Sequence, residues 1–173
     1  MVNASLSSVV YFYNMQKLIL ETTVGNDFKL IGLNANLEPF KLAFLINNNL
    51  QFLFCRNKED ITLIHKSFQI NFALFSYCDP KTDCILYFIQ NKSEYIDQKH
   101  KFVASLFEND EHVIGKHLIE SHKQCDYFIK IEDEFQSFKI KKLIMQLNEI
   151  PQIVSAYEIP IETLKSPENL IFE

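Results

Sequence analysis

Glycine is scarce in this chain, and its scarcity excludes several ways of binding phosphate. The 3 glycines, Gly25, Gly32 and Gly115, stand far apart in the sequence. The dinucleotide fingerprint and the Walker loop both need closely spaced glycines, because only then can the backbone approach a phosphate. The Gly-x-Ser-x-Gly turn of many hydrolases and the His-Glu-x-x-His zinc motif are absent as well. The sequence therefore excludes nucleotide binding of those two kinds and the commonest hydrolase signatures.

Arginine is nearly absent too, and the chain is acidic. Arg56 is the only arginine, and 22 acidic residues outnumber 17 basic residues to give a net charge of -5. Arginine is the side chain that holds a phosphate through two parallel hydrogen bonds, and nucleic-acid binders normally carry a surplus of cations. Nucleic acid is therefore disfavoured as a partner, but it is not excluded, because lysines can still gather locally.

The 4 cysteines, Cys55, Cys78, Cys84 and Cys125, form no recognisable framework. They include no C-x-x-C pair, and they lack the compact spacing of small disulfide-rich secreted domains. A structural zinc ion needs four clustered thiolates or imidazoles. We therefore expect a cytoplasmic protein with free thiols, no metal and no cofactor.

Long apolar runs are also missing, so we expect no membrane span. Residues 1–14 are uncharged, but they lack the basic start and the cleavage site of a signal peptide. We interpret residues 1–14 as a loose N-terminal arm or start-site extension, and residues 15–173 as a single domain. With 47% hydrophobic residues, 16 of the 173 residues being Phe, this domain should form one aromatic-rich core.

The first half of the domain predicts a strand, a helix and a second strand. The strand covers residues 28–33, Asn36 is the expected helix N-cap, and Pro39 fits the first helical turn because its missing N–H costs nothing there. The helix should run to Asn48, and residues 51–55 should form the next strand. This helix is apolar around most of its circumference, so it is either deeply buried or covered by a partner.

The rest of the chain predicts a hairpin and a second strand, helix and strand unit. Residues 68–78 should pair with residues 84–90 across the Asp-Pro-Lys-Thr-Asp turn. Residues 93–109 are expected to be a polar connection with one short helix around residues 102–107. The second unit is a strand at 126–131, a helix at 135–147 and a strand at 152–159.

These elements predict the α+β class. We expect a mixed or mainly antiparallel sheet with helices on one face, formed by two strand-helix-strand units around a hairpin. Ferredoxin-like packing is one version of this arrangement.

Two polar clusters could carry chemistry, but their spacing argues against it. His112, His117 and His122 follow one another at five-residue steps, which place them neither on one helix face nor on one side of a strand. We expect them to be exposed or hydrogen bonded rather than metal ligands. The carboxylates 132–134 precede a helix, where they favour the helix dipole and cap amides, so capping is expected there rather than acid–base catalysis.

A lysine face is the strongest case for a nucleic-acid site. Lys139, Lys141 and Lys142 lie within one turn of the second helix, and Lys116, Lys123 and Lys130 could extend this basic face, with Tyr127 as a stacking residue. Acidic residues are interleaved with these lysines, and lysine on a helix exterior is usually just solvated. We therefore expect that the face does not bind nucleic acid.

Several stretches resemble the family of small Bacteroidota proteins named IPExxxVDY. The naming motif resembles residues 118–131 (LIESHKQCDYFIKI), and further matching blocks occur in the same order at 28–32, 42–47, 53–56 and 164–172. The motif differs here because its Pro is missing, its spacer is one residue longer, and Cys125 replaces Val. Only Glu120, Asp126 and Tyr127 match cleanly, so the resemblance implies that these residues form a family signature or possible binding site.

Asp126 and Tyr127 are neighbours on a predicted strand, so their side chains should point in opposite directions. We expect Tyr127 to be buried with its hydroxyl hydrogen bonded, and Asp126 to bind backbone amides of a nearby turn.

The leading functional hypothesis is a non-enzymatic protein-interaction or accessory module, whose partner is another protein or a second copy of the chain. A weak RNA-associated module using the lysine face is the alternative. An enzyme with an unrecognised site is the third possibility.

Overall fold

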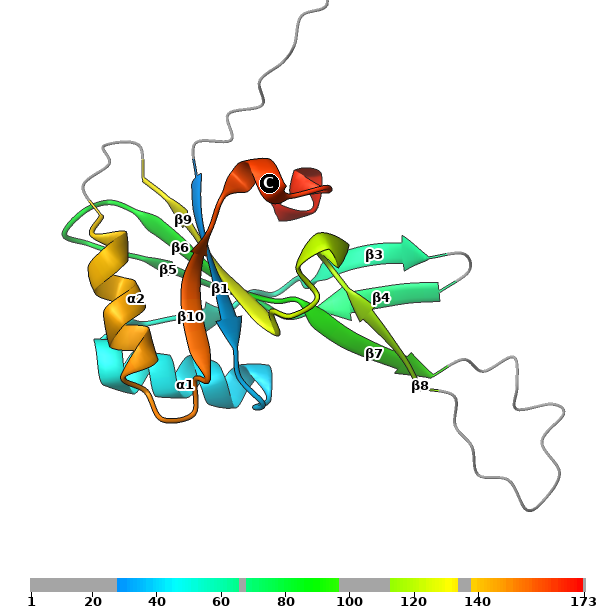
Figure 1. The fold of residues 1–173 in the computed structure, drawn as a ribbon, viewed down its shortest axis with the longest axis horizontal. Helices are drawn as coiled ribbons and strands as arrows, with labels where there is room; N and C mark the ends of the chain where they lie inside the picture. Colours follow the sequence, from blue (N-terminus) through cyan, green and yellow to red (C-terminus); the bar gives the residue numbers. More distant parts are fainter. Residues whose placement is uncertain (1–27, 66–67, 97–112, 134–137, 173) are drawn as a thin grey trace, which may run out of the picture.

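The computed structural model describes residues 28–65, 68–96, 113–133 and 138–172 (Figure 1). The arm expected at residues 1–14 and the short helix expected at residues 102–107 lie outside the described residues. So do His112 and Glu134.

The centre of the structure is a six-stranded sheet in which every neighbouring pair is antiparallel. Its strands, in spatial order, are β10 (Ser155–Ile159), β1 (Phe28–Asn34), β9 (Tyr127–Glu132), β6 (Ile85–Gln90), β5 (Leu74–Cys78) and β2 (Cys55–Arg56). The α+β class and the antiparallel sheet are thus confirmed.

The ferredoxin-like version of this fold is wrong for its first unit. In that packing each helix connects two strands that flank a third strand. The helix α2 (Ile140–Asn148) does so, because it leads from β9 to β10 on either side of β1. The helix α1 (Pro39–Leu50) instead leads from β1 to β2 at the opposite edge, because the β5–β6 hairpin occupies the positions next to β9.

Local hydrogen bonds explain where α1 and its neighbours depart from the sequence prediction. Glu38, not Asn36, precedes the helix, and no side chain caps it. Gln51 ends the helix in the left-handed conformation, with φ of 58°. The Asn47 amide then binds both backbone groups of Phe54, at 2.9 Å to its N–H and 3.0 Å to its carbonyl. Phe54 is thereby taken out of strand pairing, so β2 is shorter than the predicted 51–55 strand.

The predicted long hairpin bends instead of staying in one sheet. The 68–78 segment divides into β4 (Phe68–Phe72) and β5, and β6 continues into β7 (Lys92–Ile96). β4 pairs with β3 (Ile61–His65), and β7 pairs with β8 (Val113–His117), so two hairpins project from the sheet (Figure 1). The sequence prediction missed β3, β7 and β8.

Asn91 holds the bend between β6 and β7. Its side chain is fully buried and hydrogen bonded to three backbone groups of the 119–125 segment: its Oδ1 accepts from Ile119 N–H, and its Nδ2 donates to the carbonyls of His122 and Cys125. The buried Asn91 amide thus provides hydrogen-bond partners for backbone groups of a loop that has no strand neighbour of its own.

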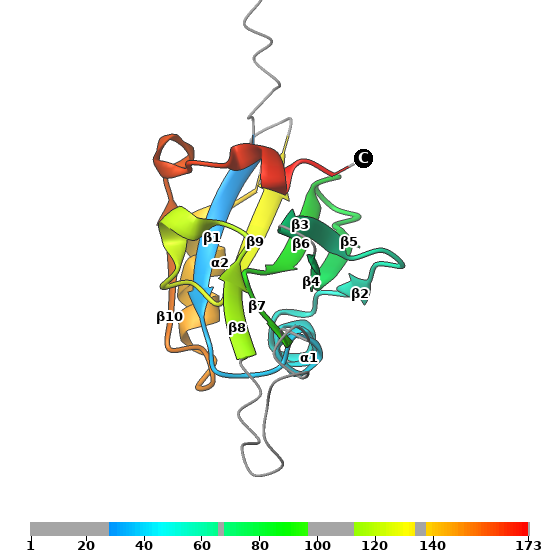
Figure 2. The ribbon, with the colours of Figure 1, turned by 90° about the vertical axis from the view of Figure 1, so that its right-hand side faces the viewer.

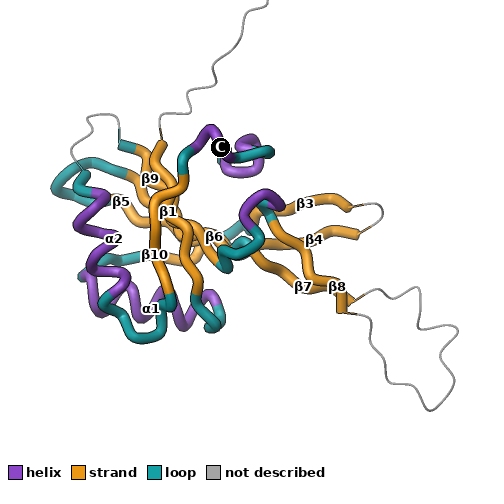
Figure 3. Tube along the Cα trace, viewed as in Figure 1, coloured by secondary structure: helices purple, strands orange, loops and turns teal. Residues whose placement is uncertain are grey.

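Both faces of the sheet are covered, but by different kinds of structure. On one face, α1 and α2 contribute the buried side chains Leu42, Ile46, Leu143 and Leu147, which confirms that the helices share a face (Figure 3). α2 is shorter than predicted, because Phe138 and Lys139 precede it.

The second face is covered by short 3-10 turns. These are η2 (Glu120–His122), η3 (Ile161–Thr163) and η4 (Pro167–Leu170), and Figure 2 shows η2 in front of the sheet with α2 behind it. Leu118, Ile119, Leu164 and Leu170 pack there against Leu30 and Phe128. In the described part of the chain, no helix is long and apolar enough to cross a membrane.

Gly32 is where a side chain would break this second layer. An added Cβ would lie 2.6 Å from Cys125 Sγ and 2.8 Å from Ile159 Cδ1. We expect Gly32→Ala to lower the free energy of unfolding by about 1–3 kcal/mol, the usual cost of overpacking. Urea denaturation measures the change.

The matched control is Gly115→Ala, whose nearest neighbour would be Lys92 Cε at 3.9 Å. This control should change stability by less than about 0.5 kcal/mol. Adding Ile159→Val to Gly32→Ala should restore part of the loss. Equal stability of the two glycine variants would contradict this account of the packing.

Candidate functional site

Asp126 and Tyr127, two of the residues on which the family resemblance rests, brace the backbone at the start of β9. Asp126 Oδ2 accepts a hydrogen bond of 2.9 Å from Ala35 N–H, just after β1. Tyr127 is 4% exposed, its hydroxyl donates to the Leu37 carbonyl, and its ring stacks on Phe88 with centroids 5.1 Å apart. The expectation for Tyr127 is confirmed, whereas Asp126 lies just before β9 and binds a single backbone amide rather than the amides of a turn. Because the backbone uses both polar groups, the pair supports a structural role.

The protonation of Tyr127 agrees with that role. Burial, followed by the negative charges of Asp126 and Glu38, raises the pKa of Tyr127 to about 12. The phenol is therefore neutral at physiological pH, and it acts as a hydrogen-bond donor rather than as a base.

Glu120, the third residue on which the resemblance rests, lies at the surface in η2. Its carboxylate pairs with Lys123 at 2.8 Å and with Lys116 at 3.5 Å. The hydrogen bond from Lys123 lowers the pKa of Glu120, with the charges of both lysines acting in the same direction and partial burial opposing them. Exposed pairs of this kind contribute little to stability.

The structure does not assemble the larger basic face. Lys139, Lys141 and Lys142 are exposed, but Lys130 is only 3% exposed and Tyr127 is buried, so neither can contact a nucleic acid. The two remaining lysines, Lys116 and Lys123, pair with Glu120. The expectation that the lysine face does not bind nucleic acid stays a prediction.

The polar clusters serve structure where the chain is described. Asp133 Oδ2 accepts a hydrogen bond of 2.7 Å from Phe138 N–H in the approach to α2. The four cysteines are free thiols. Within residues 28–65, 68–96, 113–133 and 138–172, no group of three or more His, Cys, Asp or Glu side chains could hold a metal ion.

His122 is a buried histidine with both ring nitrogens engaged. Thr163 Oγ1 donates to the Pro160 carbonyl at 2.6 Å, so it accepts from His122 Nε2, which lies 3.2 Å away. Ser121 Oγ lies 3.0 Å from Nδ1, and it donates to Nδ1 when the ring is neutral. These partners fit the neutral ring, and burial lowers the pKa of His122.

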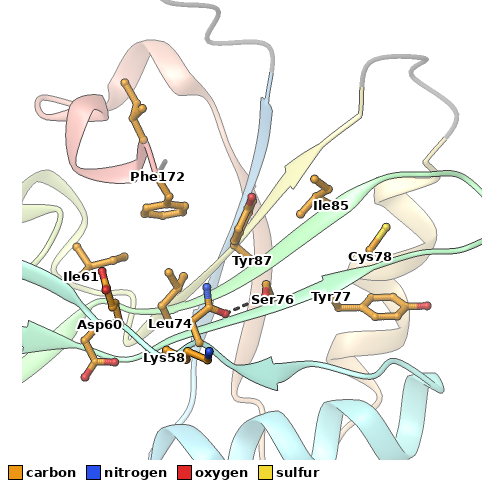
Figure 4. Close-up of a pocket in the computed structure, with 13 residues that line it drawn as sticks. Lys58, Asp60, Ile61, Leu74, Ser76, Tyr77, Cys78, Ile85, Tyr87 and Phe172 are labelled. Carbon is orange, nitrogen blue, oxygen red and sulfur yellow. Dashed lines mark hydrogen bonds between the residues drawn. The ribbon is translucent and has the colours of Figure 1, made fainter.

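A cavity of about 630 Å³ lies between the 57–60 loop, the β5–β6 hairpin and the C-terminal residues (Figure 4). We call residues 167–172 the C-terminal strap and this space the strap cavity. Figure 4 shows the Phe172 ring above and Lys58 below, with Leu74 between them and Tyr87 beside Phe172. The strap cavity is lined by Asn57, Lys58, Glu59, Asp60, Ile61, Leu74, Ser76, Tyr77, Cys78, Ile85, Tyr87, Ile171 and Phe172.

A buried lysine behind the strap cavity fixes the strap. Lys130 Nζ donates to the Leu170 carbonyl at 2.7 Å and pairs with Glu132 at 2.5 Å. Three aromatic rings surround the ammonium group, with centroids at 4.8 Å for Phe172, 5.0 Å for Phe28 and 5.4 Å for Tyr87. Such rings attract a cation through their electron-rich faces.

Sequence reasoning missed the strap cavity and gave Lys130 the wrong surroundings. One signal was present, because Lys130 interrupts the apolar run Phe128, Ile129 and Ile131 in a central strand. A charge in such a run must be buried with partners. The identity of those partners was not visible, because Phe28 and Leu170 are distant in the chain.

Tyr127 offers a direct test of the bracing role. Tyr127→Phe should lower the free energy of unfolding by about 1 kcal/mol, the net value of one hydrogen bond. Tyr127→Ala should lower it by about 3 kcal/mol or more, because it leaves a cavity against Phe88. Chemical denaturation measures both. Unchanged stability in both variants would contradict the structural role.

His122 should make stability depend on pH. Its folded pKa is lowered, so the unfolded chain binds the proton more tightly, and stability is lost as pH falls below about 6.5, the usual value for histidine. Denaturation between about pH 5 and 8 avoids most carboxylate titration.

His122→Gln, which cannot titrate, should flatten this part of the stability profile. Burial also lowers the pKa of His117. His117→Gln is therefore measured alongside as the matched control, so that the contributions of the two histidines to the stability profile can be separated. A profile that His122→Gln leaves unchanged would contradict the assignment.

Comparison of the chain with protein-family models, with curated proteins and with solved structures finds no match. The resemblance to the IPExxxVDY family therefore stays an expectation, and the function must be argued from the described surface and cavity.

Proposed function

We propose that this protein is a non-enzymatic interaction module that associates with a second copy of itself through the solvent face of α1. The observation that carries the proposal is a pair of exposed aromatic side chains, Phe40 at 60% and Phe44 at 63% exposure. They lie one turn apart, on the side of α1 opposite the buried Leu42 and Ile46. Their exposure supports the proposal that a partner covers this face of α1.

Among the residues that the structure describes, the other exposed apolar side chains offer no comparable pair on a helix face. Ile64 is on β3, Ile85 is on β6 and Met145 is on α2, while Leu53, Val154 and Ile171 stand in loops. Single exposed apolar side chains are normal on a protein surface and need no partner. Two exposed phenylalanines four residues apart on a helix are a more specific feature, because side chains at this spacing are neighbours on one helix face.

The edges of the main sheet are poor sites for association. The Asn148 amide binds the N–H and the carbonyl of Ala156 on β10, at 2.9 Å each, and Pro160 follows the strand without an N–H. The opposite edge, β2, has only two residues. Short or blocked edges discourage the addition of another strand.

The charges around α1 favour a second copy as the partner. Lys41 pairs with Glu38 at 3.0 Å on the same helix face, and Asn48 and Asn49 follow at the other end. The surface around Phe40 and Phe44 is therefore locally neutral, so two copies can approach without like-charge repulsion. Two antiparallel α1 helices would place the aromatic pairs together in a two-fold interface, the commonest kind in homo-oligomers.

The test is self-association of the Phe40→Ser, Phe44→Ser double variant. We expect the unaltered protein to form dimers as its concentration rises, and the double variant to dimerise about a hundredfold more weakly or worse, because truncating a buried aromatic anchor costs on the order of 1–2 kcal/mol or more. Sedimentation velocity measures the dissociation constants.

Ile64→Ser is the matched control, since Ile64 is 82% exposed but lies on the projecting β3–β4 hairpin. This variant should dimerise like the unaltered protein. A protein that stays monomeric at every concentration would contradict the proposal, as would a double variant that still dimerises normally.

A further inference from the structure

We propose that the strap cavity binds a small aromatic carboxylate, with its ring against Phe172, Tyr87 and Leu74 and its carboxylate at Lys58 and Asn57. This ligand site is separate from the α1 surface. It lies beside the second face of the sheet, where the C-terminal strap packs.

The dimensions of the strap cavity fit a small molecule. Its volume of about 630 Å³ falls within the range of about 300–1,000 Å³ that ligand sites occupy. Ile85 and Ile171 line it while remaining 37% and 46% exposed, so apolar surface faces the opening rather than the core. A ligand with an apolar body would cover that surface.

The ring wall is held in place before any ligand arrives. Tyr87 and Phe172 contact each other edge to face, with centroids 5.1 Å apart, and both rings lie against the Lys130 ammonium. Lys130 also binds the Leu170 carbonyl, so the strap is fixed on both sides of Ile171. Lys130 is a positioning residue in this site, because it is not part of the cavity lining. A fixed wall lowers the entropic cost of binding a flat ring.

The polar side offers mainly hydrogen-bond donors. The Asp60 carboxylate already pairs with Arg56 at 2.5 Å, and Asn57 Oδ1 accepts a hydrogen bond of 2.8 Å from Ser76 Oγ. The Asn57 amide is left with its N–H donors for a ligand. Lys58 makes no ion pair with any residue that the structure describes. An ammonium group and amide donors recognise a carboxylate. Glu59 also lines the cavity and would instead attract a cation. A comparison of anionic and cationic ligands therefore tests the proposal.

Phenylacetate is the probe, and phenethylamine, which carries a cationic head on a similar ring, is its matched counterpart. We expect phenylacetate to bind saturably to the full chain in isothermal titration calorimetry and to raise the melting temperature, whereas phenethylamine should bind at least about tenfold more weakly.

The chain has no tryptophan, so F172W adds a single indole fluorophore at the cavity, and its emission should change saturably as phenylacetate is added. Lys58→Met should weaken phenylacetate binding by about tenfold or more, the effect of one charge-assisted hydrogen bond. Lys142→Met, on the exposed side of α2, should leave it unchanged.

No saturable phenylacetate binding by the unaltered chain would overturn the proposal. Preferential binding of phenethylamine would overturn it too, as would full affinity in Lys58→Met. The Phe40→Ser, Phe44→Ser variant should bind phenylacetate normally, so failure of this site and failure of the α1 interface give different results.

Discussion

Burial of β9 on both faces is the constraint around which the rest of the structure is arranged. β9 lies between β1 and β6, and every side chain from Tyr127 to Ile131 is at most 4% exposed. A strand buried on both sides needs two separate layers over it. The two α helices provide one layer, and the short turns between β8 and β9 and after β10 provide the other.

Lys130 determines which segment packs over part of the second face of the sheet. Its ammonium group would be costly to bury without partners, and it obtains them from Glu132, the Leu170 carbonyl and three aromatic rings. Two of these partners come from the end of the chain. The requirement to satisfy one buried charge in the central strand therefore determines where the C-terminal strap lies, and the strap in turn forms one wall of the cavity.

Side-chain amides provide hydrogen-bond partners for backbone groups in the loops, as neighbouring strands do in the sheet. Asn47 binds both backbone groups of Phe54, Asn148 binds both groups of Ala156, and Asn91 serves three backbone groups in the 119–125 segment. A chain with few glycines cannot often use unusual backbone conformations to turn. Amide side chains allow its backbone to leave a strand while remaining hydrogen bonded. One consequence is that the β10 edge is blocked to a further strand at Ala156.

The sequence by itself determined the local features whose cause lies within a few neighbouring residues. The apolar periodicity of α1, the turn between β5 and β6, and the α+β class all follow from such short-range patterns. The burial of Tyr127 was also accessible, because it begins a strand whose residues are mostly apolar. Only the tertiary structure decided which faces were covered and which charges were buried. The outward position of Phe40, the partners of Lys130 and the cavity under Phe172 depend on contacts between distant segments, and no periodicity along the chain records such contacts.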